Sequence, residues 1–162
     1  MTEWPPRDAE ELREWLDNDL QTWRERRRLL VERIANATSI MQSPRWSHIR
    51  IARTSVSDPT GRIARRWIEE LPTVREELAV IDAMLEEYRI AKVGLDTDRL
   101  KVIEGTYDLH LGPAEIYESI GISRSTFYEY LRDARERMLA VLRFRAEMRG
   151  QNVGQTSDKN PA

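Results

Sequence analysis

The stretch that decides the fold of this chain is residues 113–134, which read PAEIYESIGISRSTFYEYLRDA. Pro113 stands at the first-turn position where a helix tolerates proline, and Gly121 ends that short helix. Ser123 is a typical N-cap residue, so a second helix is predicted to begin there and to run through Leu142. The sequence therefore predicts two helices joined by a tight turn, which is the pattern of a helix-turn-helix.

The apolar residues of this stretch have the spacing that a helix-turn-helix needs on the inner face of its helices. Gly121 lies where the turn requires a residue without Cβ. Tyr117 departs from the pattern, because the position four residues before the glycine usually holds alanine. We expect this tyrosine to point away from the helix contact or to widen it, and an ordinary helical hairpin is the alternative interpretation. The predicted inner residues are Ile116, Ile120, Ile122, Phe127 and Tyr130.

If the unit binds DNA, the exposed first turns of its second helix meet the major groove. Arg124 is predicted to make a bidentate contact with guanine, whereas Ser125 and Thr126 are predicted to donate to phosphate. Arg132 and Arg135 are expected to hold the flanking backbone. The full predicted DNA-binding set is Ser123, Arg124, Ser125, Thr126, Tyr128, Glu129, Arg132 and Arg135.

Charge is distributed unevenly, although the net charge of the 162-residue chain is only −2. From Gly121 to Gly150, seven arginines stand against four acidic residues, a net charge of +3. From Leu95 to Ile120, two basic and six acidic residues give a net charge of −4. The total excludes a histone-like binder that acts by bulk charge, whereas the segment from Gly121 onward has the local positive charge of a nucleic-acid interface.

The first part of the chain is predicted to form two long helices. One spans residues 8–37, with Asp8 as its N-cap, and the other spans residues 60–92. Pro72 lies inside the second helix and predicts either a kink or a fresh start, and the capping-box spacing of residues 73–76 favours the fresh start. The regular apolar seam of this second helix indicates packing against the first helix as a hairpin or against a second copy. That seam comprises Ala64, Trp67, Leu71, Val74, Leu78, Ile81, Leu85 and Tyr88.

Several other segments carry weaker signals. Residues 38–60 lack periodicity, and a short extended segment around Ile49 and Ile51 is compatible with their alternation. A third short helix is predicted at residues 98–107, after Gly94 and a cap at Asp96 or Thr97. The first long helix also carries clustered arginines, for which we favour a solvated, ion-paired face over a nucleic-acid contact. These arginines are Arg24, Arg26, Arg27, Arg28 and Arg33, with Glu25 and Glu32 as the expected partners.

Composition argues against familiar enzyme chemistry. The chain has no cysteine, so disulfides, thiolate metal sites and cysteine nucleophiles are excluded. His48 and His110 have no companion ligands nearby, and no glycine-rich phosphate loop occurs. We therefore expect no catalytic residue, no metal and no cofactor, and a protein that is not an enzyme. No apolar run approaches the roughly 20 residues of a membrane span, and residues 1–7 do not resemble a signal peptide, so a cytoplasmic location is expected.

The chain resembles the RinA/ArpU group of phage-encoded transcriptional regulators, whose C-terminal helix-turn-helix is similar to region 4 of sigma factors. The matching residues are AEIYESIGISRSTFYEYLRDA, 114–134, with weaker support from residues 57–60 leading into a helix and from the helix of residues 100–107. The resemblance spans roughly residues 55–145. It implies an all-helical activator of late, packaging or lysis genes at a phage or prophage promoter in a bacterial host cell.

These features predict an all-α protein in three parts: a helical oligomerisation or interaction region at residues 1–93, a helix-turn-helix DNA-binding domain at 94–149, and a disordered tail at 150–162. The leading hypothesis is a sequence-specific DNA-binding transcriptional regulator. Its expected partners are double-stranded DNA, further copies of itself with a dimer favoured, and RNA polymerase as an additional candidate. The alternatives are a phage small terminase subunit or packaging adaptor, and a helical interaction protein that binds no DNA.

Overall fold

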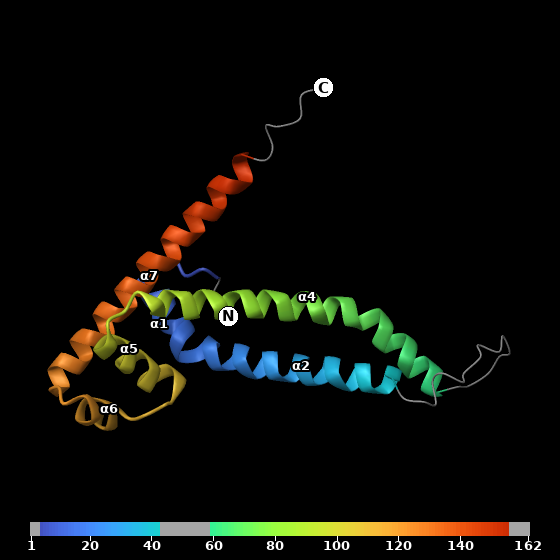
Figure 1. Ribbon diagram of the computed structural model, residues 1–162, viewed down its shortest axis with the longest axis horizontal. Helices are drawn as coiled ribbons and strands as arrows, with labels where there is room; N and C mark the ends of the chain where they lie inside the picture. Colours follow the sequence, from blue (N-terminus) through green and yellow to red (C-terminus); the bar gives the residue numbers. More distant parts are fainter. Residues whose placement is uncertain (1–3, 43–58, 156–162) are drawn as a thin grey trace. The chain divides into compact units, whose positions relative to one another are not determined.

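The computed structural model describes residues 4–42 and 59–155 of the chain. Its regular elements within these ranges are helices, without a strand, so the predicted all-α class is confirmed (Figure 1). The chain divides into two compact units, here called the hairpin unit (Thr22–Ala83) and the terminal unit (Met1–Gln21 with Met84–Ala162). In chain order the elements are α1 (Ala9–Glu14), η1 (Trp15–Asp19), α2 (Leu20–Gln42), α4 (Pro59–Val93), α5 (Thr97–Ile103), η2 (Glu104–Asp108), α6 (Pro113–Ile120) and α7 (Arg124–Gln155).

The first long helix begins where the sequence predicts. The Asp8 carboxylate accepts hydrogen bonds from the amides of Glu10 and Glu11, both at 2.9 Å, and so caps α1. The helix then widens into the π-helical turn η1 before α2 continues it. A π-helical turn shifts the register of the residues that follow. The sequence pattern did not predict this turn, nor the burial of Trp15, which is 1% exposed, together with Leu12, Leu16 and Leu20.

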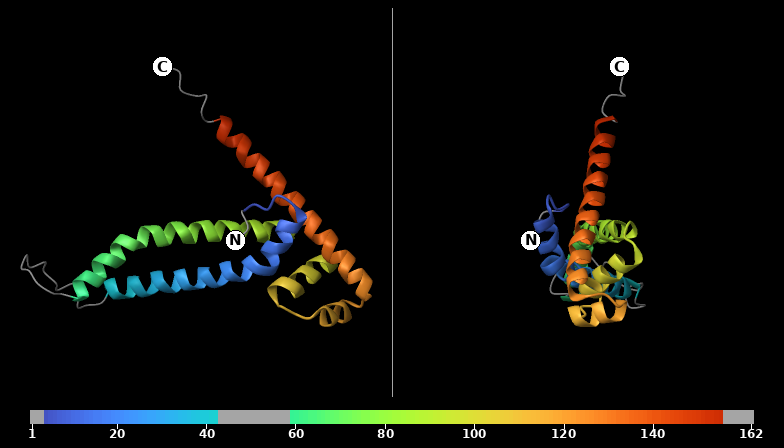
Figure 2. Two further views of the ribbon diagram at one scale, coloured as in Figure 1. Left: turned by 180° about the vertical axis from the view of Figure 1, so that it is seen from behind. Right: turned by 90° about the vertical axis from the view of Figure 1, so that its left-hand side faces the viewer.

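Within the hairpin unit, α2 and α4 lie side by side in opposite directions (Figures 1 and 2). Arg26 donates to both carboxylate oxygens of Glu77 at 2.6 and 3.0 Å, and Arg33, farther along α2, donates to Glu70, which comes earlier on α4. The arginine cluster is therefore an ion-paired face, with most partners on α4 rather than on α2 itself. Further pairs on this face are Arg27–Asp82, Arg28–Glu25 and Arg28–Glu32.

α4 is one continuous helix, so the favoured fresh start after Pro72 is wrong, and the alternative of a bent helix that continues through the proline holds instead. Proline removes one amide donor and crowds the preceding turn, which bends a helix without ending it when packing supports both sides. α4 accordingly bends in its first half (Figure 1). The apolar seam is otherwise as predicted: Val74, Ile81 and Tyr88 are buried and the leucines between them are half-buried. The predicted seam residues Ala64 and Trp67 lie outside the side chains that the structure describes.

The terminal unit has its core between α7 and the short helices around it. α5 packs against both α6 and α7, and α1 also packs on α7. Trp15 lies between two other rings, with centroid distances of 4.5 Å to Trp4 and 5.9 Å to Tyr88. The fully buried side chains of this core include Leu12, Leu20, Val102, Ile103, Phe127, Met138 and Leu142.

The third predicted helix is present as α5 followed by the π-helical turn η2. Asp96 caps it, accepting a hydrogen bond from the amide of Arg99 at 3.1 Å. Lys92, at the end of α4, ties that helix to η2 through Asp108 at 2.6 Å and Glu104 at 3.3 Å. These contacts hold η2 in place, and η2 in turn supports α6.

Two predicted segments fall partly or wholly outside the described residues. The extended segment around Ile49 and Ile51 lies wholly outside them. α7 runs to Gln155, six residues into the segment predicted to be a disordered tail. A helix that is already nucleated adds residues at little cost, so it continues beyond its last apolar contact.

Gly105, in η2, allows α6 to dock closely. A Cβ atom at this position would lie 2.9 Å from Cγ1 and 3.0 Å from Cδ1 of Ile116, whose side chain is 2% exposed. Because a packed core has no room for another methyl group, Gly105→Ala is expected to lower the free energy of unfolding by about 1–3 kcal/mol in urea titrations. Gly94→Ala is the control, since its Cβ would meet only Val141 Cγ2 at 4.0 Å. Equal losses in the two variants would contradict the close contact.

Candidate nucleic-acid interface

α6 begins and ends through local contacts. The amide of Gly112 donates to Glu115 Oε2 at 2.8 Å, and Pro113 occupies the first turn. At the other end, Gly121 adopts φ 79° and ψ 32°, and the amides of Gly121 and Ile122 both donate to the carbonyl oxygen of Tyr117 at 3.0 Å. The left-handed turn predicted at Gly121 is thus confirmed, and it redirects the chain into α7 within three residues.

α7 starts at the predicted cap. Ser123 Oγ accepts from the amide of Thr126 at 3.1 Å and lies 2.8 Å from the hydroxyl oxygens of both Ser125 and Thr126. Three hydroxyl groups therefore gather at the first turn of α7. The amides of that turn and the positive end of the helix dipole favour an anion here.

The predicted inner residues are at least partly covered. Ile116 and Phe127 are 2% and 1% exposed, and Ile120, Ile122 and Tyr130 are half-buried. Tyr117, the departure from the expected pattern, is half-buried as well. This packing joins α6 to α7 and to the rest of the terminal unit, and it leaves the opposite side of the first turns of α7 to solvent.

Gly121 is where a side chain is expected to strain the turn. A Cβ there would meet no atom within 4 Å, so the cost of Gly121→Ala comes from its positive φ alone. L-residues other than glycine lose about 1–2 kcal/mol in this conformation, and we expect that loss in the free energy of unfolding by urea titration. Gly121→Asn is the control, because asparagine tolerates the left-handed region better. An alanine variant as stable as the asparagine variant would contradict this assignment.

Most arginines of α7 have partners within the terminal unit. Arg145 donates to the two carboxylate oxygens of Glu87 at 2.7 and 3.0 Å, and Arg149 lies 3.3 Å from the same carboxylate. The hydrogen bond from Arg145 lowers the pKa of Glu87, against the effect of burial. Because the Glu87 side chain is only 9% exposed, these pairs join α7 to α4 as part of the fold.

Arg135, one of the predicted DNA-binding residues, is also engaged. Its Nε donates to the hydroxyl oxygen of Tyr107 at 2.9 Å, and its guanidinium carbon lies 5.7 Å from the centre of the Tyr107 ring. Burial raises the pKa of Tyr107, so this hydroxyl stays protonated at neutral pH. The sequence pattern gives no sign of this contact, since 28 residues separate Tyr107 from Arg135.

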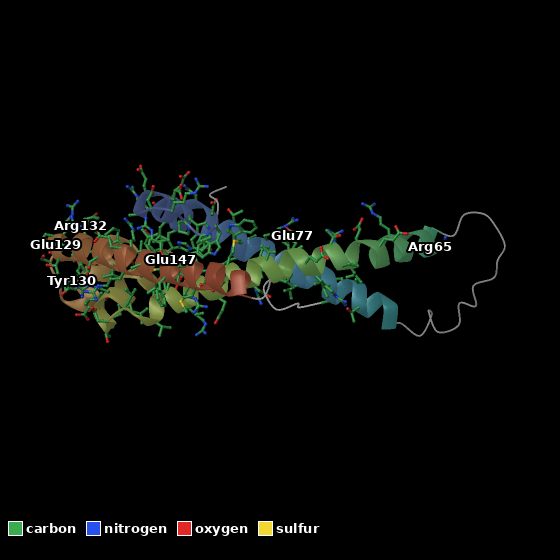
Figure 3. All side chains as sticks on the ribbon, turned by 90° about the horizontal axis from the view of Figure 1, so that it is seen from above. Arg65, Glu77, Glu129, Tyr130, Arg132 and Glu147 are labelled. Atoms are coloured by element: carbon green, nitrogen blue, oxygen red, sulfur yellow. The ribbon has the colours of Figure 1, made fainter. Side chains whose placement is uncertain are left out.

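Arg124 and Arg132 differ from the other arginines of α7. Both are exposed, and neither forms an ion pair with any residue that the structure describes. The guanidinium of Arg124 lies 6.0 Å from the ring centre of Tyr128, which is 48% exposed. Glu129, Tyr130 and Arg132 lie together on the early turns of α7, well before Glu147 (Figure 3). Of the predicted set, six residues are exposed, and Thr126 and Arg135 are half-buried.

Other kinds of site find no support in the described parts of the chain. No group of three or more histidine, aspartate and glutamate side chains there is arranged to hold a metal ion. No described helix is long and apolar enough to cross a membrane. Comparisons of the chain with family models, with curated proteins and with solved structures found no match.

Proposed function

We propose that the protein is a sequence-specific DNA-binding transcriptional regulator that uses α6 and α7 as a helix-turn-helix. The observation that carries the proposal is the division among the seven arginines of α7. Five of them, Arg135, Arg137, Arg143, Arg145 and Arg149, bind groups of the chain itself. Arg124 and Arg132 remain exposed to bind an external anion. They lie on the early turns, where a reading helix meets DNA.

The spacing of these two arginines suits one groove of duplex DNA. Arg124 and Arg132 are eight residues apart, which is a rise of about 12 Å along a helix. A reading helix contacts base edges with its N-terminal residues, so a residue about two turns later lies nearer the border of the groove. We assign Arg124 to the guanine edge inside the groove and Arg132 to phosphate at its border. The hydroxyls of Ser125 and Thr126 are assigned to phosphate, aided by the amides at the start of α7.

The remaining exposed residues extend the same surface. Glu129 is assigned to an amino group of cytosine, because carboxylates accept hydrogen bonds from that group in the major groove. Tyr128 supports Arg124 through its ring. Arg135 is assigned here to positioning through Tyr107 rather than to direct contact with phosphate.

Recovery of bound duplexes from a random pool tests the proposal directly. We expect enrichment of one short motif, because base contacts from the first turns of α7 discriminate among sequences. The association constant for the recovered motif is expected to fall with rising salt. For each phosphate contact, its logarithm should drop by about 0.9 per tenfold increase in salt concentration. The absence of binding at low salt would exclude both a regulator and a packaging adaptor, and binding without an enriched motif would exclude sequence-specific reading.

The resemblance to phage regulators supports a role in activating late genes of a phage or prophage in the bacterial cytoplasm. A homodimer is proposed because two reading helices on duplex DNA match two half-sites. RNA polymerase is a second proposed partner, in line with the similarity to region 4 of sigma factors. Mass measurement in solution distinguishes this dimer from a large ring, which would favour a terminase subunit instead.

A further inference from the structure

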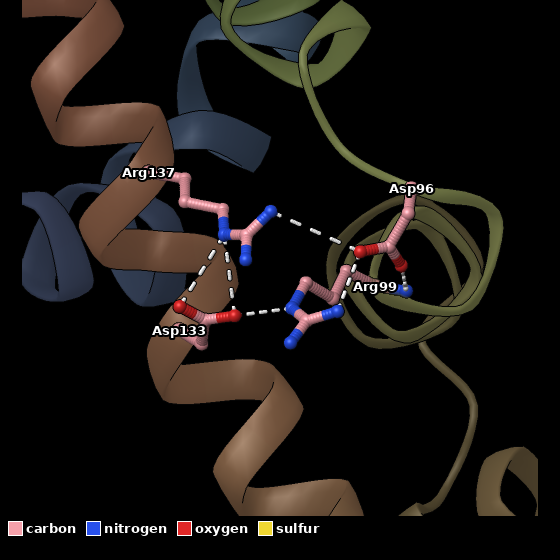
Figure 4. A network of polar contacts seen from close by, with 4 residues as sticks. All are labelled: Asp96, Arg99, Asp133 and Arg137. Carbon is pink, nitrogen blue, oxygen red and sulfur yellow. Dashed lines mark hydrogen bonds and ion pairs between the residues drawn. The ribbon is translucent and has the colours of Figure 1, made fainter.

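Four charged residues form a closed network between α7 and the start of α5 (Figure 4). Arg99 donates from Nε to Asp133 and from Nη1 to Asp96. Arg137 lies with its Nε 3.2 Å from Asp133 Oδ2 and its Nη1 3.9 Å from Asp96 Oδ2. Two carboxylates thus hold two guanidinium groups, and the four formal charges cancel.

The network persists at neutral pH. The hydrogen bond from Arg99 lowers the pKa of Asp133, and the hydrogen bond from the Arg99 amide is the main cause that lowers the pKa of Asp96. Arg99 is held further by the ring of Tyr130, whose centre lies 4.6 Å from the guanidinium carbon. The Arg99 side chain is only 21% exposed, whereas that of Arg137 is 49% exposed. Arg137 is therefore the arginine restrained mainly by its charge partners.

The network borders the surface assigned to DNA. Asp133 follows Arg132 directly and lies one helical turn after Glu129, and Arg137 lies one turn farther along. An arginine released at this border would reach phosphates that flank the reading helix. Phosphate contacts add affinity for every DNA sequence alike, so each such contact raises non-specific binding.

We propose that Asp96 and Asp133 are specificity-determining residues that withhold Arg99 and Arg137 from the DNA backbone. The inference rests on the proposed DNA-binding function and identifies a restraint built into the same site. The restraint keeps non-specific affinity low, and a regulator needs this because the genome offers a vast excess of competing sites. The carboxylates act through the arginines and do not read bases themselves.

Three charge-neutralising variants test this restraint on the full chain. D133N removes the carboxylate that both arginines share. D96N keeps the cap of α5, because asparagine caps a helix about as well as aspartate. It removes the negative charge that pairs with Arg99 and Arg137 at this position. E136Q is the matched control: Glu136 lies on the same helix, is exposed, and pairs with no cation of the described residues. All three variants remove one negative charge.

The readouts are binding to random duplex DNA and to the recovered motif over a range of salt concentrations, with circular dichroism to confirm folding. In D133N we expect random-duplex affinity to rise about fivefold to tenfold and the salt slope to steepen by about 0.9 for each arginine released. D96N should change in the same direction by less, and the ratio of specific to random affinity should fall in both variants. E136Q should change neither the slope nor the ratio appreciably.

Three results would overturn the inference. Equal changes in D133N and E136Q would show that only net charge matters, and unchanged slopes in folded D96N and D133N would show that the arginines are not withheld. If D133N unfolds, the random-duplex affinity and the salt slope of D96N alone test the inference. Failure of the wild-type chain to bind DNA at all would instead overturn the proposed function, and the inference with it.

Discussion

Arg124→Ala is expected to weaken binding to the preferred DNA sequence by about 1–3 kcal/mol, roughly a 5- to 150-fold loss, and to remove the preference at one base pair. The guanidinium of Arg124 is exposed at the first turn of α7, where it forms no ion pair with a described residue and lies 6.0 Å from the ring centre of Tyr128. It is therefore free to form two hydrogen bonds with guanine, and alanine loses both. Competition binding against single-base variants of the recovered motif measures the effect.

Arg132→Ala is the matched comparison, because it removes the same charge from the same helix. As a phosphate contact, Arg132 should contribute equally to all sequences, so its loss should lower affinity uniformly and reduce the salt slope by about 1. The two variants must therefore differ in their effect: Arg124→Ala should change the base preference, whereas Arg132→Ala should lower the affinity for all sequences alike. An Arg124→Ala protein with unchanged base preference would refute the assignment of Arg124 to a base.

Phe127→Ala is expected to lower the free energy of unfolding of the terminal unit by about 3–5 kcal/mol. The Phe127 ring is 1% exposed and joins the first turn of α7 to the core, so its removal leaves a large cavity. Typical domains have a total stability of only about 5–15 kcal/mol, so this single change is severe. Urea unfolding followed by circular dichroism measures the loss, and DNA binding should fall with the folded fraction.

Tyr128→Ala is the control for this prediction. Tyr128 is the adjacent residue and its ring packs edge-on against Phe127 at 5.1 Å, but it is 48% exposed. Its removal should cost about 1 kcal/mol or less, since surface truncations leave no cavity. Comparable losses in the two variants would contradict the burial of Phe127 and the exposure of Tyr128.

The abundance of arginine in this chain has a structural explanation beside the proposed functional one. Several arginines form two-point contacts with carboxylates, among them Arg26 with Glu77, Arg89 with Glu86, and Arg145 with the buried Glu87. The planar guanidinium fits such pairs better than the point charge of lysine does. Exposed pairs of this kind contribute little stability individually, about 0–1 kcal/mol each, so they orient helices more than they hold the fold together.

Features that depend on neighbours within about four residues were predictable from the sequence. The caps at Asp8, Asp96 and Ser123 and the left-handed turn at Gly121 follow from the identity of single residues at helix ends. The inner residues of α6 and α7 followed from periodicity, because a helix presents every third or fourth residue on the same side. The candidate site was predictable for the same reason, because all eight of its predicted residues lie within the cap and early turns of one helix.

Contacts between residues distant in sequence were decided only by the tertiary structure. Periodicity could not show that Gly105 lets Ile116 approach, or that α4 continues through Pro72. It also could not show which arginines are exposed, because a side chain's partner may lie 28 or 58 residues away, as for Arg135 and Arg145. The sequence by itself determined an all-α chain with a basic final helix. Tertiary packing decided which positive charges remain available, because the guanidinium donors of an arginine that already binds a carboxylate, hydroxyl or carbonyl group of the chain are engaged, and an arginine–carboxylate pair as a whole has no net charge to offer a phosphate.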